Sequence, residues 1–225
     1  MSKQSIESED SEAAEAAEAT EVEASGTRAR RVSRGTLGVI AAAVVVVLVA
    51  VLAVTWSVTR KDVVPYDDPQ SSGLLTLCDE SGNQVTKGSV KDKPFAPIVL
   101  GSTPVDQKVA ADAAVNATLF GYQPRESVDP VEFSGSPIGG PVPFVNHDRP
   151  ATRVVKDAWS IGNFVEVFPA KFKGYVQLRL ITSTTGIGAL TNAYDTADIK
   201  VDGDSWHVVR GGNASCSGAA DLLGD

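Results

Sequence analysis

The feature that most limits what this chain can fold into is an uninterrupted apolar segment near its N-terminus. No charged residue occurs between Gly35 and Val58, and valine, alanine and leucine make up most of the stretch. A helix of this length, rising about 1.5 Å per residue, crosses the roughly 30 Å hydrocarbon core of a bilayer. In lipid the backbone must satisfy its own hydrogen bonds, so a lone span has to be helical. We therefore expect residues 35–58 to form a single-pass transmembrane helix in contact with membrane lipid.

The charges on either side of this segment set its orientation. Four arginines precede it closely: Arg28, Arg30, Arg31 and Arg34. Only Arg60 and Lys61 follow it, and Trp56 lies near that end, where interfacial aromatic residues are common. Positive residues gather on the cytoplasmic side, so we expect the N-terminus in the cytoplasm and the C-terminal part outside the cell membrane. A cleaved signal peptide is the alternative, but its apolar region would be only about 7–15 residues long, which favours an uncleaved signal anchor.

Residues 1–34 differ sharply in character from this segment. Before the arginine cluster, Lys3 stands against eight acidic residues, and the stretch has no apolar face to bury. We expect a disordered acidic cytoplasmic tail. A block of like charge is usually a solvated tail, and the alternative is a docking site for a basic cytoplasmic partner.

The rest of the chain shows the pattern of a polar linker followed by a β-rich domain. Residues 59–72 contain two prolines and several aspartates, which predicts a stalk, and residues 73–225 would form the extracytoplasmic domain. Short apolar runs separated by turn residues indicate strands at 74–78, 94–100, 117–122 and 175–182, with a turn at 79–83. In the last of these runs Val176, Leu178 and Leu180 should point to one face and Gln177 and Arg179 to the other.

The strongest local signal is a hairpin over residues 197–209. Asp202-Gly203 is a favoured two-residue turn, and the register it sets places every apolar residue except Val209 on one face. The pairs predicted by this register are Ile199 with Trp206, Ala197 with Val208, Lys200 with Ser205 and Asp198 with His207.

One short helix is expected among the strands. Apolar residues recur at helical spacing from Ile161 to Phe168, with Ser160 as the N-cap and Pro169 as the stop. The predicted fold is mainly β, a two-layer antiparallel β-sandwich with this helix over one open end. It would be only loosely Ig-like, because the Cys–Trp–Cys spacing of immunoglobulin domains is missing.

The chain has two cysteines, Cys78 and Cys216, and they bracket the predicted domain. This placement favours a disulfide formed in an oxidising compartment. The alternative is a pair of separate buried thiols. A bond that closes so long a loop would contribute about 5 kcal/mol at most in the chain-entropy description.

Three stretches carry a resemblance to a known group of proteins. They are Leu-Leu-Thr-Leu-Cys78-Asp-Glu-Ser-Gly, Gly-Tyr-Val-Gln-Leu-Arg179, and Tyr194-x-x-x-Asp-Ile-x-Val-x-Gly-Asp-x-Trp206 before the last cysteine. Over about residues 73–216 the chain resembles uncharacterised membrane-anchored proteins of actinobacteria. The resemblance implies a topology and a habitat, and it implies no reaction.

Candidate chemistry is sparse. The two histidines, His147 in a proline-ended loop and His207 on the polar face of the hairpin, are each expected to be surface residues, because no nucleophile motif accompanies either. Two scattered histidines and two cysteines that we expect to be bonded make a zinc site improbable. Four acids could suggest calcium but lack the spacing of a known calcium loop: Asp195, Asp198, Asp202 and Asp204. We therefore expect no catalytic residue, no metal and no cofactor.

The net charge and the lengths of two loops indicate which kinds of partner the chain could bind. The net charge is −8 and no basic stripe follows the span, which argues against nucleic acid. Two long loops, residues 128–150 and 182–192, are candidates for binding, because long loops in small domains are often functional. The leading hypothesis is a non-enzymatic, membrane-anchored extracytoplasmic binding or assembly module. The alternatives are an accessory subunit of a membrane complex, with a protein partner, and a cell-envelope hydrolase with a non-standard site.

Overall fold

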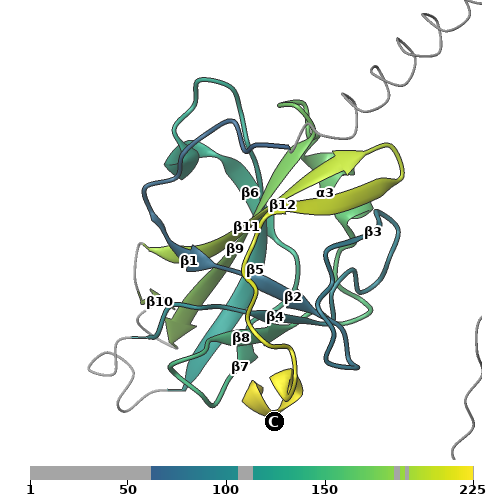
Figure 1. Cartoon of the computed structure of the whole chain (residues 1–225). Coiled ribbons are helices and arrows are strands. Elements are labelled where there is room, and N and C mark those ends of the chain that lie inside the picture. Colours follow the sequence, from purple (N-terminus) through teal and green to yellow (C-terminus); the bar gives the residue numbers. More distant parts are fainter. Residues whose placement is uncertain (1–61, 106–113, 185–187, 191–192, 225) are drawn as a thin grey trace, which may run out of the picture. The chain divides into compact units, whose positions relative to one another are not determined.

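Strands and turns make up most of the folded chain (Figure 1). The computed structural model describes residues 62–105, 114–184, 188–190 and 193–224. These contain strands β1 (Ser71–Leu74), β2 (Thr76–Cys78), β3 (Lys87–Ser89), β4 (Ile98–Leu100), β5 (Val115–Gln123), β6 (Ser134–Pro137), β7 (Val142–Pro143), β8 (Ala151–Arg153), β9 (Tyr175–Thr184), β10 (Gly188–Ala189), β11 (Tyr194–Asp202) and β12 (Ser205–Arg210). The helices are α3 (Ile161–Val167) and two 3₁₀ turns, η1 (Pro130–Glu132) and η2 (Ala219–Leu222). The described part of the chain is therefore mainly β and contains one α-helix, as the sequence predicts for the domain.

The predicted tail (1–34) and the predicted span (35–58) lie outside the described residues. Among the residues that are described, none of the helices has the length and apolar character needed to cross a bilayer.

The larger sheet is built around β9 and β11. Its strands run in the order β3-β12-β11-β9-β5-β6, with β1 joined to β11, β10 to β9 and β7 to β5. These pairings are antiparallel except that of β1 with β11, which is parallel. Along β9 and β11 apolar and polar residues alternate, so the two faces of the sheet differ in chemistry.

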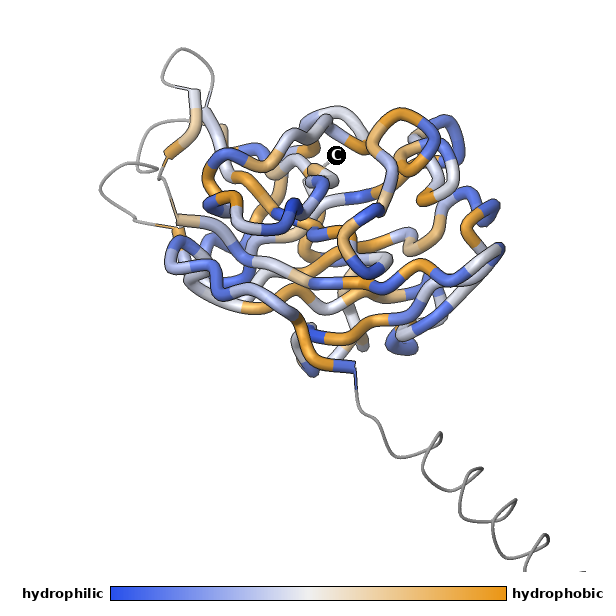
Figure 2. The backbone as a smooth tube through the Cα atoms, turned by 90° about the horizontal axis from the view of Figure 1, so that it is seen from above, coloured by the Kyte–Doolittle hydropathy of each residue, from blue (hydrophilic) through white to orange (hydrophobic). Residues whose placement is uncertain are grey.

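A smaller antiparallel sheet, β2-β4-β8, lies over one face of the larger sheet. Its Leu77 and Val99 belong to the same buried cluster as Leu119, Leu178 and Ile199 of the larger sheet. We call the face of the larger sheet that contributes to this cluster the inner face, and the opposite one the outer face. Figure 2 shows the alternation of apolar and polar residues along the strands. Two sheets around a common core are consistent with the predicted β-sandwich.

The expected strand over residues 74–78 is divided between the two sheets. It breaks at Leu75, so that β1 joins the larger sheet and β2 the smaller one. The backbone N–H of Leu75 donates to the carbonyl of Thr196, and its side chain is buried in the core. The expected strand at 94–100 is shorter than predicted, with only Ile98–Leu100 in the ladder, whereas β5 and β9 extend beyond their predicted ends.

The hairpin forms, but its turn lies one residue further along than predicted. Asp202 pairs with Ser205, so Gly203 and Asp204 are the loop residues. Gly203 has φ +56° at the first loop position, where type II′ turns place glycine. The observed pairs are Val201 with Trp206, Lys200 with His207, Ile199 with Val208 and, past a bulge, Asp198 with Arg210.

The predicted hairpin partners were therefore wrong, but the predicted core face was right. Between the turn and the bulge, the register shift moves each partner by two positions. Side chains alternate with a period of two, so the apolar set stays inward. Trp206 is accordingly 1% exposed, and its ring packs edge-on against Phe95 at 5.8 Å between centroids.

Helix α3 agrees with the sequence prediction. Ser160 caps it, accepting a hydrogen bond from the backbone of Asn163, whose side chain accepts in return from the backbone of Ser160. Ile161 and Phe164 are fully buried in the core. Helix α3 thus covers part of the core that the two sheets enclose.

The two expected long loops contain more structure than the sequence suggests. Residues 128–150 include η1, β6 and β7, and their Phe133, Ile138 and Phe144 are buried. Backbone pairing with β5 fixes this stretch. In the second loop β9 continues to Thr184, and Gly188–Ala189 pairs back onto it.

Candidate functional site

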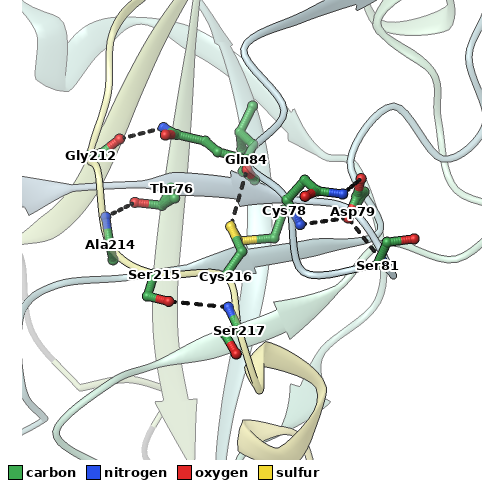
Figure 3. The surroundings of a disulfide bond; sticks show 12 residues. Thr76, Cys78, Asp79, Ser81, Gln84, Gly212, Ala214, Ser215, Cys216 and Ser217 are labelled. Atoms are coloured by element: carbon green, nitrogen blue, oxygen red, sulfur yellow. Dashed lines mark hydrogen bonds between the residues drawn. A yellow bond between two sulfur atoms is a disulfide. The ribbon is translucent and has the colours of Figure 1, made fainter. Parts of the chain in front are cut away.

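The disulfide predicted from the two cysteines is present (Figure 3). Cys78, at the end of β2, bonds to Cys216, just before η2, with 5.6 Å between their Cα atoms. Hydrogen bonds continue the contact: Gln84 Nε2 donates to the carbonyl of Gly212 at 2.8 Å, and the backbone of Ala214 donates to Thr76 Oγ1 at 3.0 Å. The bond therefore fastens the C-terminal segment to the smaller sheet.

The main surprise is the position of the segment expected to be a stalk. Residues Asp62–Gln70, which we call the docked segment, lie against the outer face of β9 and β11. Asp68 is 5% exposed, and its carboxylate accepts hydrogen bonds from Gln177 Nε2 at 3.1 Å and from the Tyr194 hydroxyl at 3.2 Å. The same carboxylate lies 3.7 Å from the guanidinium of Arg179. Residues 62–70 are thus part of the folded domain.

Arg179 is the centre of the outer-face contacts. It is 3% exposed, although it lies on the polar side of its strand. Its Nε donates to Gln177 Oε1 at 2.6 Å and its Nη2 to the carbonyl of Pro130 at 2.7 Å. The guanidinium carbon stands 3.9 Å from the ring centroid of Tyr122 and 4.4 Å from that of Tyr194. These cation–π contacts and hydrogen bonds replace the hydration that the guanidinium group of an exposed arginine would have.

A second buried acid, Asp198, lies at the bulge of the hairpin, where it pairs with Arg210. Asp198 is 0% exposed; it accepts from Arg210 Nε at 2.7 Å and from the hydroxyl of Tyr66 in the docked segment. Burial raises the pKa of Asp198, and the hydrogen bonds from Tyr66 and Arg210 oppose that rise. Burial also raises the pKa of Tyr66, so its phenol remains a hydrogen-bond donor. Asp198 was predicted on a solvated face, and the docked segment is what covers it.

At its N-terminal end the docked segment makes a more exposed contact. Asp62 pairs with Lys200, and its other carboxylate oxygen lies 3.0 Å from His207 Nε2. The hydrogen bond from Lys200 lowers the pKa of Asp62, and the same bond raises the pKa of Lys200. His207 was expected opposite Asp198, but it lies opposite Lys200 and is partly exposed, as a surface residue.

Asp195, one of the acids considered for calcium, holds two parts of the backbone together. One carboxylate oxygen accepts from the backbone of Ser102 at 2.6 Å and of Thr103 at 2.9 Å, and the other from Thr103 Oγ1 at 2.5 Å. Glycines make room for it, because a Cβ at Gly73 would stand 2.4 Å from Oδ1 and one at Gly101 2.6 Å from Oδ2. This contact fastens the loop after β4 to the larger sheet.

A cavity of about 160 Å³ adjoins the Asp195 contact. Its wall is mostly apolar and also carries hydroxyl groups, and its lining residues include Ser72, Thr103, Val105, Leu180, Thr182 and Tyr194. An apolar cavity of roughly 150 Å³ is large enough to take benzene. By its size and lining, this pocket can hold a small, largely apolar molecule.

The remaining candidates, His147, Asp202 and Asp204, are not among the residues that line the pocket. The ring of His147 packs edge-on against Phe144 at 5.8 Å, and its carbonyl accepts from the backbone of Val105. Asp202 and Asp204 lie at the hairpin end, where Asp204 pairs with Lys91 at 3.4 Å. In the described ranges no three His, Cys, Asp or Glu side chains gather in a way that could hold a metal ion.

Sequence reasoning overlooked the residues that the structure brings together on the outer face. A signal was present: Arg179 stands among the apolar residues of β9, and Asp198 and Lys200 occupy alternate positions of the adjacent strand β11. The sequence also offers acids, Asp67 and Asp68, in a short polar segment before the domain.

Compared with known protein families, with curated proteins and with solved structures, the chain finds no match.

Proposed function

We propose that this chain is a membrane-anchored extracytoplasmic binding module. Residues 35–58 would be its signal anchor, with the N-terminus in the cytoplasm, and the β domain, a loosely Ig-like sandwich, would lie outside the membrane. The Cys78–Cys216 bond supports an extracytoplasmic location for the β domain, because disulfides persist in oxidising compartments. The arginines before the apolar segment support the same orientation.

The pocket beside Asp195 is the proposed ligand site, and it is the observation that carries the proposal. Its wall is held in place, since the Asp195 carboxylate binds two backbone amides of the opposite loop. Preformed, mostly apolar cavities with a few polar groups are the usual form of small-molecule sites. The apolar side chains of Val105 and Leu180 and the hydroxyls of Ser72 and Thr182 fit a ligand of about the size of a substituted benzene.

Binding of a small aromatic probe tests this site directly. The full chain would be placed in phospholipid nanodiscs and titrated with para-fluorophenol, observed by fluorine NMR. We expect saturable binding that Thr182→Phe abolishes, because the larger ring fills the pocket. Ile181→Phe is the matched control: it adds similar bulk one residue earlier in β9, on the opposite face of the sheet, and should leave binding unchanged. Equal binding by both variants, or none by the unmodified chain, would refute the pocket as a ligand site.

A second function, accessory subunit of a membrane complex, is favoured by the docked segment. The predicted span ends at Val58, and only three residues separate it from Asp62, which is already bound to the domain. A domain joined so closely to its anchor suits a role at a fixed place beside membrane partners. Replacing residues 35–58 by an unrelated apolar span tests this: crosslinks to membrane proteins in native membranes should disappear if the helix packs against partners, and should persist if the β domain alone binds them.

A further inference from the structure

The docked segment and the pocket share a wall. Tyr194 lines the pocket, and on its other side it binds the docked segment. We infer that docking of residues 62–70 controls the ligand affinity of the pocket, and that a bound ligand in turn holds the segment against the sheet. This inference rests on the proposed ligand site and adds its regulation by the stretch of chain next to the membrane anchor.

Three contacts place Tyr194 under the control of the docked segment. Its hydroxyl donates to the Asp68 carboxylate at 3.2 Å, and its backbone N–H donates to the carbonyl of Gln70 at 3.2 Å. Its ring also stacks on the guanidinium of Arg179, which the Asp68 carboxylate approaches at 3.7 Å. If the segment leaves, Tyr194 loses two hydrogen bonds and the charge that keeps Arg179 in place.

A second residue of the pocket wall, Ser72, depends on the same segment. Ser72 lines the pocket and follows the docked segment by two residues. Its neighbour Ser71 donates a backbone hydrogen bond to the carbonyl of Asp68 at 3.1 Å, and its Oγ lies 2.7 Å from Thr196 Oγ1. Movement of Asp68 therefore reaches the pocket through both Tyr194 and Ser72.

The docked segment can leave without unfolding the domain. The buried hydrophobic core begins in sequence at Leu75 and includes no residue of the segment. The segment is held mainly by side-chain polar contacts, and the aromatic ring of Tyr66 packs on Phe133. A buried ion pair has a small net effect on stability, because hydration of the separated charges offsets their attraction. Such a region belongs to the parts of a protein that open locally while the core stays folded.

Linkage then requires the effect to run in both directions. A ligand that touches Tyr194 and Ser72 in their docked positions binds the docked state more tightly than the undocked one. By reciprocity, the ligand raises the population of the docked state by the same factor. Occupancy of the pocket is in this way transmitted to the residues that follow the predicted span.

The test compares two adjacent aspartates. Asp68→Asn removes the buried charge facing Arg179, whereas Asp67→Asn makes the same change at an exposed position one residue earlier. In the full chain in nanodiscs, we expect Asp68→Asn to weaken para-fluorophenol binding by about five-fold or more, the lower end of usual coupling factors. Asp67→Asn should leave the affinity unchanged. Backbone hydrogen exchange of residues 62–70 should be faster in Asp68→Asn than in the unmodified chain. Adding the probe to the unmodified chain should slow this exchange.

A rescue separates regulation from simple damage. Cysteines introduced by Ser71→Cys and Thr196→Cys replace side chains whose oxygens lie 2.7 Å apart, so an added disulfide would fix the end of the segment on β11. In the Asp68→Asn background, forming this added disulfide should restore the affinity for the probe. Reducing it should lower the affinity again. Probe binding that is unchanged by Asp68→Asn, with the segment exchanging faster, would overturn the coupling and leave the ligand site standing. Absence of probe binding in the unmodified chain would overturn both.

Discussion

The two faces of β9 and β11 are buried to the same degree by different means. On the inner face Val176, Leu178 and Ile199 pack into the core beneath the smaller sheet. On the outer face Arg179 and Asp198 are just as buried, but they are covered by the docked segment and held by charges, hydrogen bonds and aromatic rings. The inner cover belongs to the second sheet and is tied by a disulfide, whereas the outer cover is a stretch of chain without strand pairing.

The contrast shows that burial alone does not say how firmly a face is covered. Apolar area removed from water contributes roughly 25 cal/mol per Å², so the inner face supplies most of the stability. The outer face exchanges hydration for internal contacts of similar strength. We therefore expect changes on the inner face to unfold the domain and changes on the outer face to free the segment.

The largest effect is expected on the inner face. Trp206→Ala leaves a cavity beside Phe95 and should lower the free energy of unfolding by about 3–5 kcal/mol, measured by chemical denaturation. His207→Ala is the matched neighbour on the other face of β12 and should cost no more than about 0.5 kcal/mol. If the two results were exchanged, the assigned faces of the hairpin would be reversed.

Loss of the disulfide should come next, since it fastens the smaller sheet that covers the inner face. The double substitution Cys78→Ala and Cys216→Ala should cost about 2–5 kcal/mol and lower the melting temperature. The docked segment lies on the other face, so its hydrogen exchange relative to the core should not change. The unmodified, unfolded chain should show no free thiol before reduction, and titration of two thiols there would disprove the bond.

A smaller and local effect is expected from the outer face. Asp68→Leu should cost about 1–3 kcal/mol, because Arg179 then loses its acidic neighbour and the docked segment loses its hold on the sheet. Adding Arg179→Met removes the unpaired charge and should recover much of that loss. A double-mutant cycle measures the interaction between the two sites. Additive losses would mean that the two side chains do not depend on one another, and the contrast between the faces would weaken.

The smallest effect belongs to the exposed contact of Asp62 with Lys200. Exposed pairs contribute about 1 kcal/mol or less, and salt should reduce this contribution further. Because the pKa of Asp62 is lowered in the folded chain, the stabilisation is present above the ordinary aspartate pKa and is lost as the pH falls through the lowered value. Because the pKa of Lys200 is raised, it is lost again at alkaline pH. Asp62→Asn should reduce the loss of unfolding free energy at both acidic and alkaline pH, measured from denaturation curves recorded across pH. If the stability of the variant depended on pH as strongly as that of the parent, this pair would be excluded as the cause of the pH dependence.

The sequence could predict features that depend on residues close together in the chain, and the one possible pairing of two cysteines. Helix α3 follows from apolar spacing and from Ser160, both within a few residues. The alternation in β9 correctly sorted Leu178 and Arg179 to opposite faces. The disulfide follows from there being one pair of cysteines to join.

What could not be predicted depends on contacts across long stretches of sequence. Asp68 is separated from Gln177 by 109 residues and Tyr66 from Asp198 by 132, so no local pattern links them. Prolines and aspartates in residues 62–70 are typical of a linker, and that composition concealed a docked segment. The hairpin register failed because the loop consists of Gly203 and Asp204 instead of Asp202 and Gly203, which puts the positive φ of Gly203 at the first loop position. The pocket combines residues from several segments and has no signature in any of them.

The disulfide also decides how the domain would respond to tension. Suppose that the domain is pulled between Asp62 and Gly224. Force entering at Asp62 first peels the docked segment and β1, and then reaches Cys78. From there it passes through the sulfur–sulfur bond to Cys216, 138 residues further along, and on to the C-terminal end. The strands between the two cysteines carry none of the load, so at about 3.5 Å per residue the domain yields less than about 10 nm of chain before it becomes inextensible.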